Sequence, residues 1–157
     1  MRNPARLLLH VPVPWVFVLT YLSGAGVERV HSFGGEPTRR SPVVGVVGAV
    51  VFAVGAAIAS WGLWIFRRQR TTTVPGRTSA ALVTWGPYRF TRNPMYVGLT
   101  LAYLGEAGIL HQLWPVILLP LTLAYVNWIV VPLEEARLTD VFHEEYALYR
   151  ARVRRWF

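Results

Sequence analysis

An uncharged apolar block runs from residue 43 to residue 66 and constrains the fold more than any other feature of the sequence. A helix needs roughly 20 apolar residues to cross the hydrocarbon core of a bilayer. Buried helices of soluble proteins rarely hold more than about 14 apolar residues in one uninterrupted run. We therefore predict that the chain is an integral membrane protein.

Three further apolar segments accompany this block. The stretch 94–133 is too long for one crossing at about 1.5 Å per residue, and His111, Gln112 and Pro115 mark its middle, so we predict a helical hairpin that turns there. Glycines in its first half would allow close helix contact: Gly98, Gly105 and Gly108. The prediction is one all-α membrane domain over residues 1–157, with four transmembrane helices at about 7–27, 43–66, 94–111 and 115–133.

The distribution of arginine predicts the topology. All 16 basic residues are arginine; the loop 67–93 carries several and no acid, the tail 134–157 carries more, and the hairpin tip near His111 has none. The positive-inside rule then places that loop, the tail and both termini in the cytoplasm. The loop after the first span is a mild exception, because it also holds Arg29, Arg39 and Arg40.

Composition also limits the partners and the setting of the protein. The net charge of +8 lies beside apolar blocks, so topology explains it more simply than nucleic-acid binding does. There is no cysteine and the four histidines are scattered, so we expect no disulfide and no metal site. Arginine without lysine, with much alanine, valine and glycine, suggests a GC-rich bacterial genome and hence the bacterial cytoplasmic membrane. Pro12 and Pro14 interrupt the first apolar stretch, which we interpret as a retained span.

The tail 134–157 has the pattern of an amphipathic helix. Apolar residues recur at spacings of three and four: Leu138, Val141, Phe142, Tyr146, Tyr149 and Val153. Such a helix could lie on the membrane surface or cap the cytoplasmic end of the bundle.

Polar side chains cluster at both ends of the predicted hairpin. At its start, Asn93 is expected to cap the helix that opens with Pro94, and Arg89 and Arg92 either snorkel to headgroups or bind an anionic ligand. At its end, Glu134 and Glu135 are either a solvated helix start or carboxylates that bind a cation near apolar walls. A hairpin would return both clusters to one face of the membrane. Glu106, inside the third span, is a separate candidate, because ionisable groups there are costly and often functional.

The two clusters together resemble the isoprenylcysteine carboxyl methyltransferase family and its phospholipid methyltransferase relatives. The resemblance covers about residues 82–155 and rests on the pattern GPYRxxRNPMYxG, an apolar hairpin, and then EExxL…F…YxxY. It implies a membrane methyltransferase that uses S-adenosylmethionine and modifies a lipophilic acceptor entering from the bilayer among the membrane lipids. It also implies a cofactor site at the cytoplasmic face, formed by Leu82, Val83, Tyr88, Asn93, Pro94, Met95, Tyr96 and Glu134. Arg92 and Glu135 are our candidates for orienting the acceptor.

Three residues depart from the family pattern. Asn93 stands where histidine is commoner, and His143 stands where glycine often follows Phe142. Val130 stands where prenylcysteine enzymes carry an arginine for the substrate carboxylate. Valine cannot bind a carboxylate, so the resemblance implies the methyl donor but not a prenylcysteine acceptor.

Two other functions are compatible with parts of the pattern. A membrane sterol-type reductase shares an arginine–histidine–x–tyrosine element and would bind NADPH instead of S-adenosylmethionine. A non-catalytic membrane subunit could keep the same fold with an altered site, for which the three departures are the support.

Overall fold

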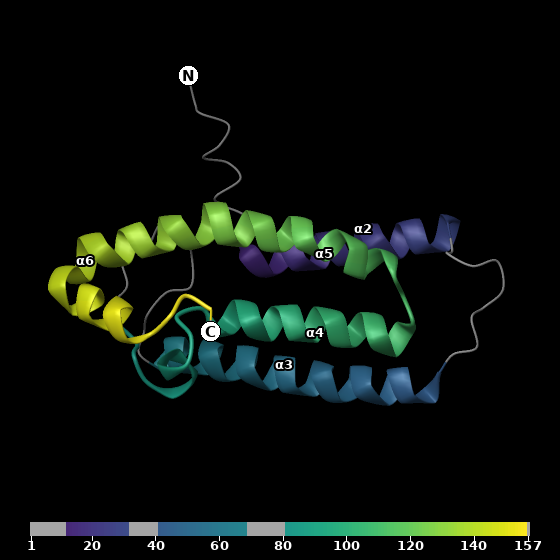
Figure 1. The fold of residues 1–157 in the computed structure, drawn as a ribbon, viewed down its shortest axis with the longest axis horizontal. Coiled ribbons are helices and arrows are strands. Elements are labelled where there is room, and N and C mark those ends of the chain that lie inside the picture. The colour runs from purple at the N-terminus through teal and green to yellow at the C-terminus, as the bar shows by residue number, and fades with distance from the viewer. Residues whose placement is uncertain (1–11, 32–40, 69–80, 157) are drawn as a thin grey trace, which may run out of the picture.

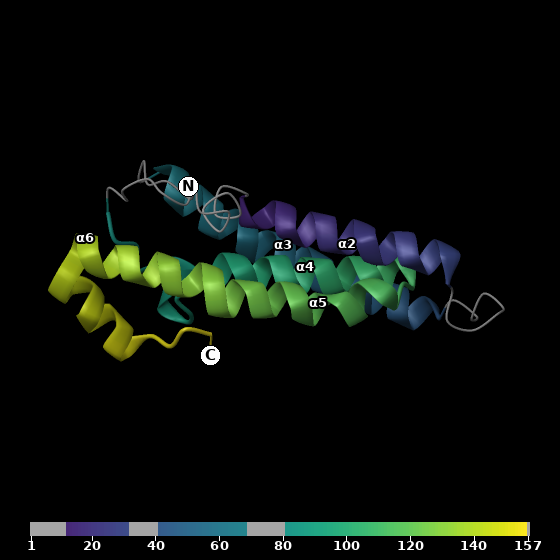
Figure 2. The same cartoon turned by 90° about the horizontal axis from the view of Figure 1, so that it is seen from above.

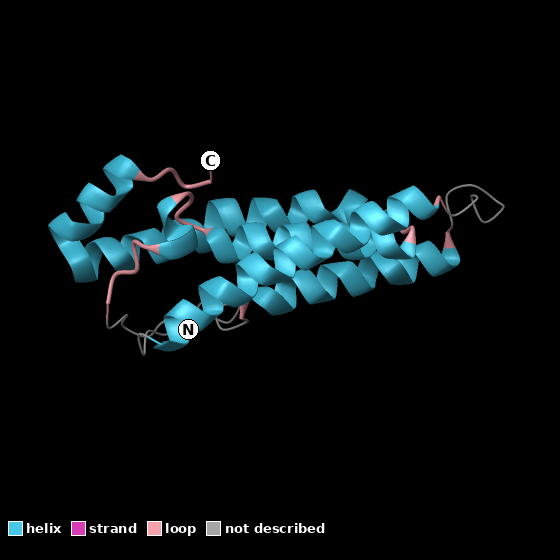
Figure 3. Cartoon of the chain, turned by 90° about the horizontal axis from the view of Figure 1, so that it is seen from below, coloured by secondary structure: helices cyan, strands magenta, loops and turns pink. Residues whose placement is uncertain are grey.

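A computed structural model describes residues 12–31, 41–68 and 81–156. Residues 7–11 of the first predicted span and residues 69–80 of the predicted central loop lie outside this part of the chain. The described helices are α2 (Val13–Val30), α3 (Pro42–Arg68), η1 (Gly86–Arg89), α4 (Pro94–Leu110), α5 (Trp114–Tyr125), η2 (Val126–Val130) and α6 (Val131–Arg152). No strand occurs within those ranges (Figure 3), which confirms the all-α prediction.

The elements are arranged as two helix pairs. α3 packs chiefly on α4, and α2 packs chiefly on α5. The single π-helical turn η2 joins α5 to α6, so that α5, η2 and the part of α6 before His143 form one long rod above α4 and α3 (Figure 1). The apolar part of this rod ends at Leu133, and the first charged residue, Glu134, follows directly without a break in the helix.

The predicted hairpin turn is present between α4 and α5. α4 ends at Leu110, His111 adopts the left-handed conformation with φ 54° and ψ 44°, and α5 begins at Trp114. Glu28 of α2 accepts hydrogen bonds from the backbone N–H groups of Leu113 and Trp114, at 2.9 and 2.8 Å. A carboxylate is favourable there, because the first N–H groups of a helix have no partner inside it.

Glycines allow the backbones of α3 and α4 to approach closely, as the sequence predicted. A Cβ atom at Gly98 would lie 2.6 Å from the backbone nitrogen of Ala59 and 2.7 Å from the carbonyl oxygen of Gly55. A Cβ at Gly48 would lie 2.7 Å from the backbone nitrogen of Ile109. Real Cβ atoms do not approach backbone atoms this closely, so only glycine fits along this interface.

Length and composition identify two helices that could cross a membrane. They are α3, and the helical run Trp114–Arg152 that contains α5, η2 and α6 and is bent at His143. α4 is shorter, at 17 residues. The apolar side chains of α3 face outward, with Val46, Val50 and Val54 exposed by 65%, 58% and 48%. Helices that expose apolar side chains around their circumference are suited to lipid.

The apolar stripe of the tail caps one end of the bundle, which decides between the two arrangements that the sequence left open. Tyr146 and Tyr149 are buried with Val83, Tyr88 and Ile65. Partly buried side chains complete this cluster: Phe66, Leu82, Leu138, Phe142 and Val153. The stripe therefore packs on η1 and the end of α3.

α6 turns back on itself at His143 (Figure 2). His143 has φ 42° and ψ −113°, a conformation that costs a residue with a Cβ atom about 1–2 kcal/mol and costs glycine little.

We expect His143→Gly to raise the free energy of unfolding in detergent by about 1 kcal/mol. Glu144→Gly is the matched control and should lower it by a similar amount, because glycine is a poor helix former. A lower stability of His143→Gly would contradict the strained bend.

Candidate functional site

A cavity of about 690 Å³ lies at the end of the bundle where α4 begins and α6 bends. All ten predicted site residues line it: Leu82, Val83, Tyr88, Arg92, Asn93, Pro94, Met95, Tyr96, Glu134 and Glu135. The hairpin therefore brings the two polar clusters into one cavity. The individual roles assigned to these residues remain predictions.

Other parts of the chain complete the cavity without any motif that could have identified them. Its apolar wall comes from Ala59, Leu63 and Phe66 of α3, Leu99 of α4, and the first turn of α2 with Pro12, Val13 and Pro14. In the sequence, nothing distinguishes these residues from the other apolar residues of the predicted transmembrane helices. Only the packing of the helices shows that they face the cavity.

Glu134 and Tyr96 join α6 to α4 across the cavity. The Tyr96 hydroxyl donates a 2.7 Å hydrogen bond to Oε1 of Glu134, which is partly buried. Burial raises the pKa of Glu134 above the usual carboxyl value, and the hydrogen bond from Tyr96 and the charge of Arg137 oppose only part of this rise. Glu134 is therefore an acidic group on an apolar wall, where a cation would stabilise its ionised form.

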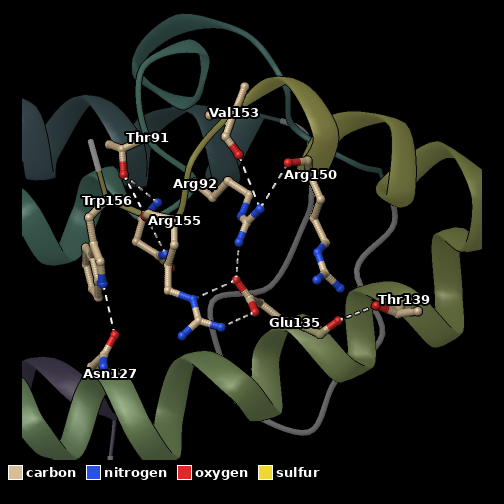
Figure 4. A network of polar contacts seen from close by, with 10 residues as sticks. Thr91, Arg92, Asn127, Glu135, Thr139, Arg150, Val153, Arg155 and Trp156 are labelled. Atoms are coloured by element: carbon tan, nitrogen blue, oxygen red, sulfur yellow. Dashed lines mark hydrogen bonds and ion pairs between the residues drawn. The ribbon is translucent and has the colours of Figure 1, made fainter.

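Arg92, Glu135 and Arg155 form a second charged cluster, of which Arg92 and Glu135 line the cavity (Figure 4). Arg92 Nη2 lies 2.7 Å from Glu135 Oε1, and Arg155 Nη2 lies 2.6 Å from Glu135 Oε2. The side chains of Arg92 and Glu135 are only 11% and 12% exposed. Burial alone would raise the pKa of Glu135, but the contacts with Arg155 and Arg92 lower it below its usual value.

The ion pair affects the prediction that Arg92 and Glu135 orient the acceptor, because both side chains already have partners within the protein. Arg92 also donates from Nη1 to the carbonyl oxygen of Val153 at 3.2 Å. Its Nε is buried and has no hydrogen-bond partner among the described residues. Most of the hydrogen-bonding capacity of Arg92 and Glu135 is thus used within the protein, which favours a structural role for both.

The expectation that the Asn93 side chain caps α4 is wrong. Asn93 occupies the N-cap position, but its side chain makes no capping hydrogen bond. Nδ2 instead donates to the carbonyl oxygen of Arg155 at 3.0 Å, and the backbone N–H of Asn93 donates to the Thr91 hydroxyl at 3.2 Å. The side chain is turned away because a segment distant in sequence offers an acceptor.

Tyrosines from the tail hold η1 against the cavity. The Tyr149 hydroxyl donates to the carbonyl oxygen of Tyr88 at 2.8 Å, and the ring of Tyr88 packs edge-on against Phe66 at 5.5 Å between centroids. Burial raises the pKa of Tyr88, which keeps the phenol protonated. Tyr146 and Tyr149 therefore support the wall that carries Tyr88.

The other sequence candidates lie elsewhere. Glu106, on the far half of α4, is not among the lining residues of the cavity. His111 lies at the opposite end of the bundle, with Nε2 3.1 Å from the carbonyl oxygen of Ser41. Within the described ranges, no three histidine, aspartate or glutamate side chains are grouped as metal ligands would be.

Residues 43–145 match the family model of phospholipid methyltransferases. This segment contains α3, the η1 loop, the hairpin and the first half of α6, and hence most of the cavity wall. No curated protein matches the chain, and no solved structure matches it.

Proposed function

The chain belongs to the phospholipid methyltransferase family, and from this we propose that it is a membrane enzyme that uses S-adenosylmethionine to methylate a lipophilic acceptor. The observation that carries the proposal is a single cavity that joins a charged end at Glu134 to an apolar wall on α3 and α4. A soluble cofactor and a lipid could meet in such a cavity. The family favours methyl transfer over NADPH-dependent reduction.

The residues present fit S-adenosylmethionine. The cavity lies within the range of about 300–1,000 Å³ that small-molecule sites usually occupy. Glu134 can accept hydrogen bonds from the ammonium group or the ribose hydroxyls, and the rings of Tyr88, which is buried, and Tyr96, which is partly buried, line the cavity and could offer faces to a cation. When bound, the cofactor supplies an electrophilic methyl group on a sulfonium.

The protein contributes mainly by binding and alignment. Methyl transfer requires the acceptor atom in line with the methyl group, and holding both reactants in one site supplies much of the rate. Ala59, Leu63 and Leu99 would hold the acceptor's hydrocarbon and exclude water. Val130 leaves no arginine for a prenylcysteine carboxylate, which supports an acceptor of another class, such as a membrane lipid.

The membrane arrangement is part of the same proposal. We place α2, α3, α4 and the apolar part of the rod, residues 115–133, as four crossings of the bacterial cytoplasmic membrane, with the cavity and both termini on the cytoplasmic side. The arginines of the loop 67–93 and of the tail 134–157 support this orientation, because the ends of α3 and α6 next to these segments contribute Phe66 and Tyr149 to the cavity wall.

Calorimetric titration of the detergent-purified protein with S-adenosylhomocysteine tests the cofactor. We expect saturable binding by the parent, and binding at least about tenfold weaker in Glu134→Gln, because a hydrogen bond to a charged group contributes about 1.5–3 kcal/mol. Glu145→Gln, an exposed neighbour on α6, should bind as the parent does. A folded parent that binds NADPH instead, or neither compound, would overturn the assignment.

The raised pKa of Glu134 gives this binding a pH dependence. The ammonium group of S-adenosylhomocysteine would bind the ionised carboxylate, and the protonated fraction of Glu134 falls as the pH rises through the raised pKa. Affinity for S-adenosylhomocysteine should therefore increase as the pH rises above the usual carboxyl pKa of 4.5, with release of a proton on binding. Titrations in buffers of different ionisation enthalpy measure that release. Glu134→Gln should remove most of the dependence, and an unchanged profile in the variant would assign it to another group.

A further inference from the structure

The segment that follows α6 returns across the cavity end of the bundle. We call residues 153–156 the strap. The backbone N–H of Arg92 donates to the carbonyl oxygen of Arg154 at 3.0 Å, and the Thr91 hydroxyl donates to that of Arg155 at 2.9 Å. Together with the bond from Asn93, these contacts fasten the strap to the residues that immediately precede α4.

The same strap is also fastened to the long rod. The Arg155 guanidinium makes two hydrogen bonds to Glu135 of α6, at 2.6 and 3.1 Å. Trp156 Nε1 donates to Asn127 Oδ1 at 2.9 Å, and Asn127 belongs to the π-helical turn η2 (Figure 4). Each anchor lies within about two turns of Glu134 along the rod.

The two helices that the strap joins belong to different helix pairs. α4, with Tyr96, packs on α3, whereas the rod that carries Glu134 packs on α2. Near the cavity, the strap contacts and the Tyr96–Glu134 and Arg92–Glu135 hydrogen bonds are polar links between the two pairs. A π-turn adds a residue to the helix and so rotates the side chains that follow it. The hydrogen bond from Trp156 to Asn127 fixes the geometry of η2, and this geometry determines the direction in which the Glu134 side chain points.

We propose that the strap sets the spacing between α4 and α6 at the cofactor site, with Trp156 as a positioning residue that acts through Asn127. The consequence for cofactor affinity rests on the proposed function, but the spacing itself does not. Neither Trp156 nor Asn127 is among the residues that line the cavity. The indole N–H of Trp156 donates its hydrogen bond to Asn127. Its effect on the ligand is therefore indirect.

Trp156→Phe removes the indole N–H and keeps an aromatic ring. Trp128→Phe is the matched control, because Trp128 is adjacent to Asn127 and 73% exposed. The chain has no cysteine, so spin labels can be placed at Phe90→Cys and Ala136→Cys, two exposed positions near α4 and on α6. Double electron–electron resonance should show a broader distance distribution in Trp156→Phe than in the parent or in Trp128→Phe. An unchanged distribution would overturn the strap's role, whether or not the protein binds the cofactor.

Ligand binding separates positioning from simple stabilisation. We expect Trp156→Phe to bind S-adenosylhomocysteine about threefold to tenfold more weakly under conditions in which it is fully folded, the loss expected for one neutral hydrogen bond. Asn127→Ala should show the same loss, and the double variant no further loss, because both changes remove one interaction. A lower melting temperature with unchanged affinity would overturn the positioning role. Failure of the parent to bind would instead refute the proposed function, and the distance measurement would still decide the strap's role.

Discussion

Glu135→Ala should lower the free energy of unfolding by about 3–5 kcal/mol, the largest effect that we expect from one side chain in this protein. The carboxylate is 12% exposed and bonds Arg92 on one side and Arg155 on the other. Its removal leaves Arg92, itself 11% exposed, as a buried charge without its ionic partner. Equilibrium unfolding of the detergent-solubilised protein, followed by circular dichroism, measures the change.

Glu145→Ala is the control for the loss of a carboxylate from α6. Glu145 is exposed and forms no ion pair with any described residue, so its replacement should change stability by less than about 0.5 kcal/mol. Glu135→Gln should lie between the two, because an amide oxygen still accepts from one arginine but carries no charge. Equal stabilities of Glu135→Ala and Glu145→Ala would mean that the cluster contributes nothing to folding.

Gly55→Leu should destabilise the protein by about 3 kcal/mol or more, because it separates α3 from α4. A Cβ at this position would lie 2.6 Å from the carbonyl oxygen of Gly98 and 2.8 Å from Cβ of Leu101. The first of these atoms belongs to a helix backbone, which cannot move aside without shifting α4. Since α4 begins at the cavity, binding of S-adenosylhomocysteine should weaken as well.

Gly26→Leu is the matched substitution in α2. A Cβ there would have no atom within 4 Å, and leucine forms helices better than glycine by about 0.5–1 kcal/mol. We therefore expect unchanged or slightly higher stability, measured as the melting temperature in detergent. If both leucine variants melted at the parent's temperature, close packing between α3 and α4 would not stabilise the bundle.

Much of the fold follows from patterns that are local in the sequence. The uncharged run 43–66 lies within one helix because a long apolar segment must satisfy its backbone hydrogen bonds internally. His111 and Pro115 predicted the turn between α4 and α5, since a chain that must cross and return needs a break near the middle. The two polar clusters at the ends of this hairpin could be assigned to one site for the same reason.

The partners of the charged residues depended on the tertiary structure. In the sequence, Arg92, Asn93 and Glu135 are polar residues next to apolar helices, with no sign of which ligand or residue they contact. The bend at His143 returns the chain so that the strap meets the start of α4, and these side chains then bond the strap and one another.

The sequence by itself thus predicted an α-helical membrane protein whose two polar clusters lie at the same end of a hairpin, because hydrophobic length and charge position act locally along the chain. The tertiary structure decided with which partner each of the polar residues is paired. Tyr96 and Glu134 meet at the cavity wall, whereas Arg92 and Glu135, which line the same cavity, are ion-paired with each other and with Arg155. The physical reason is that a buried charge must find a partner, and only the folded chain places the partners within reach.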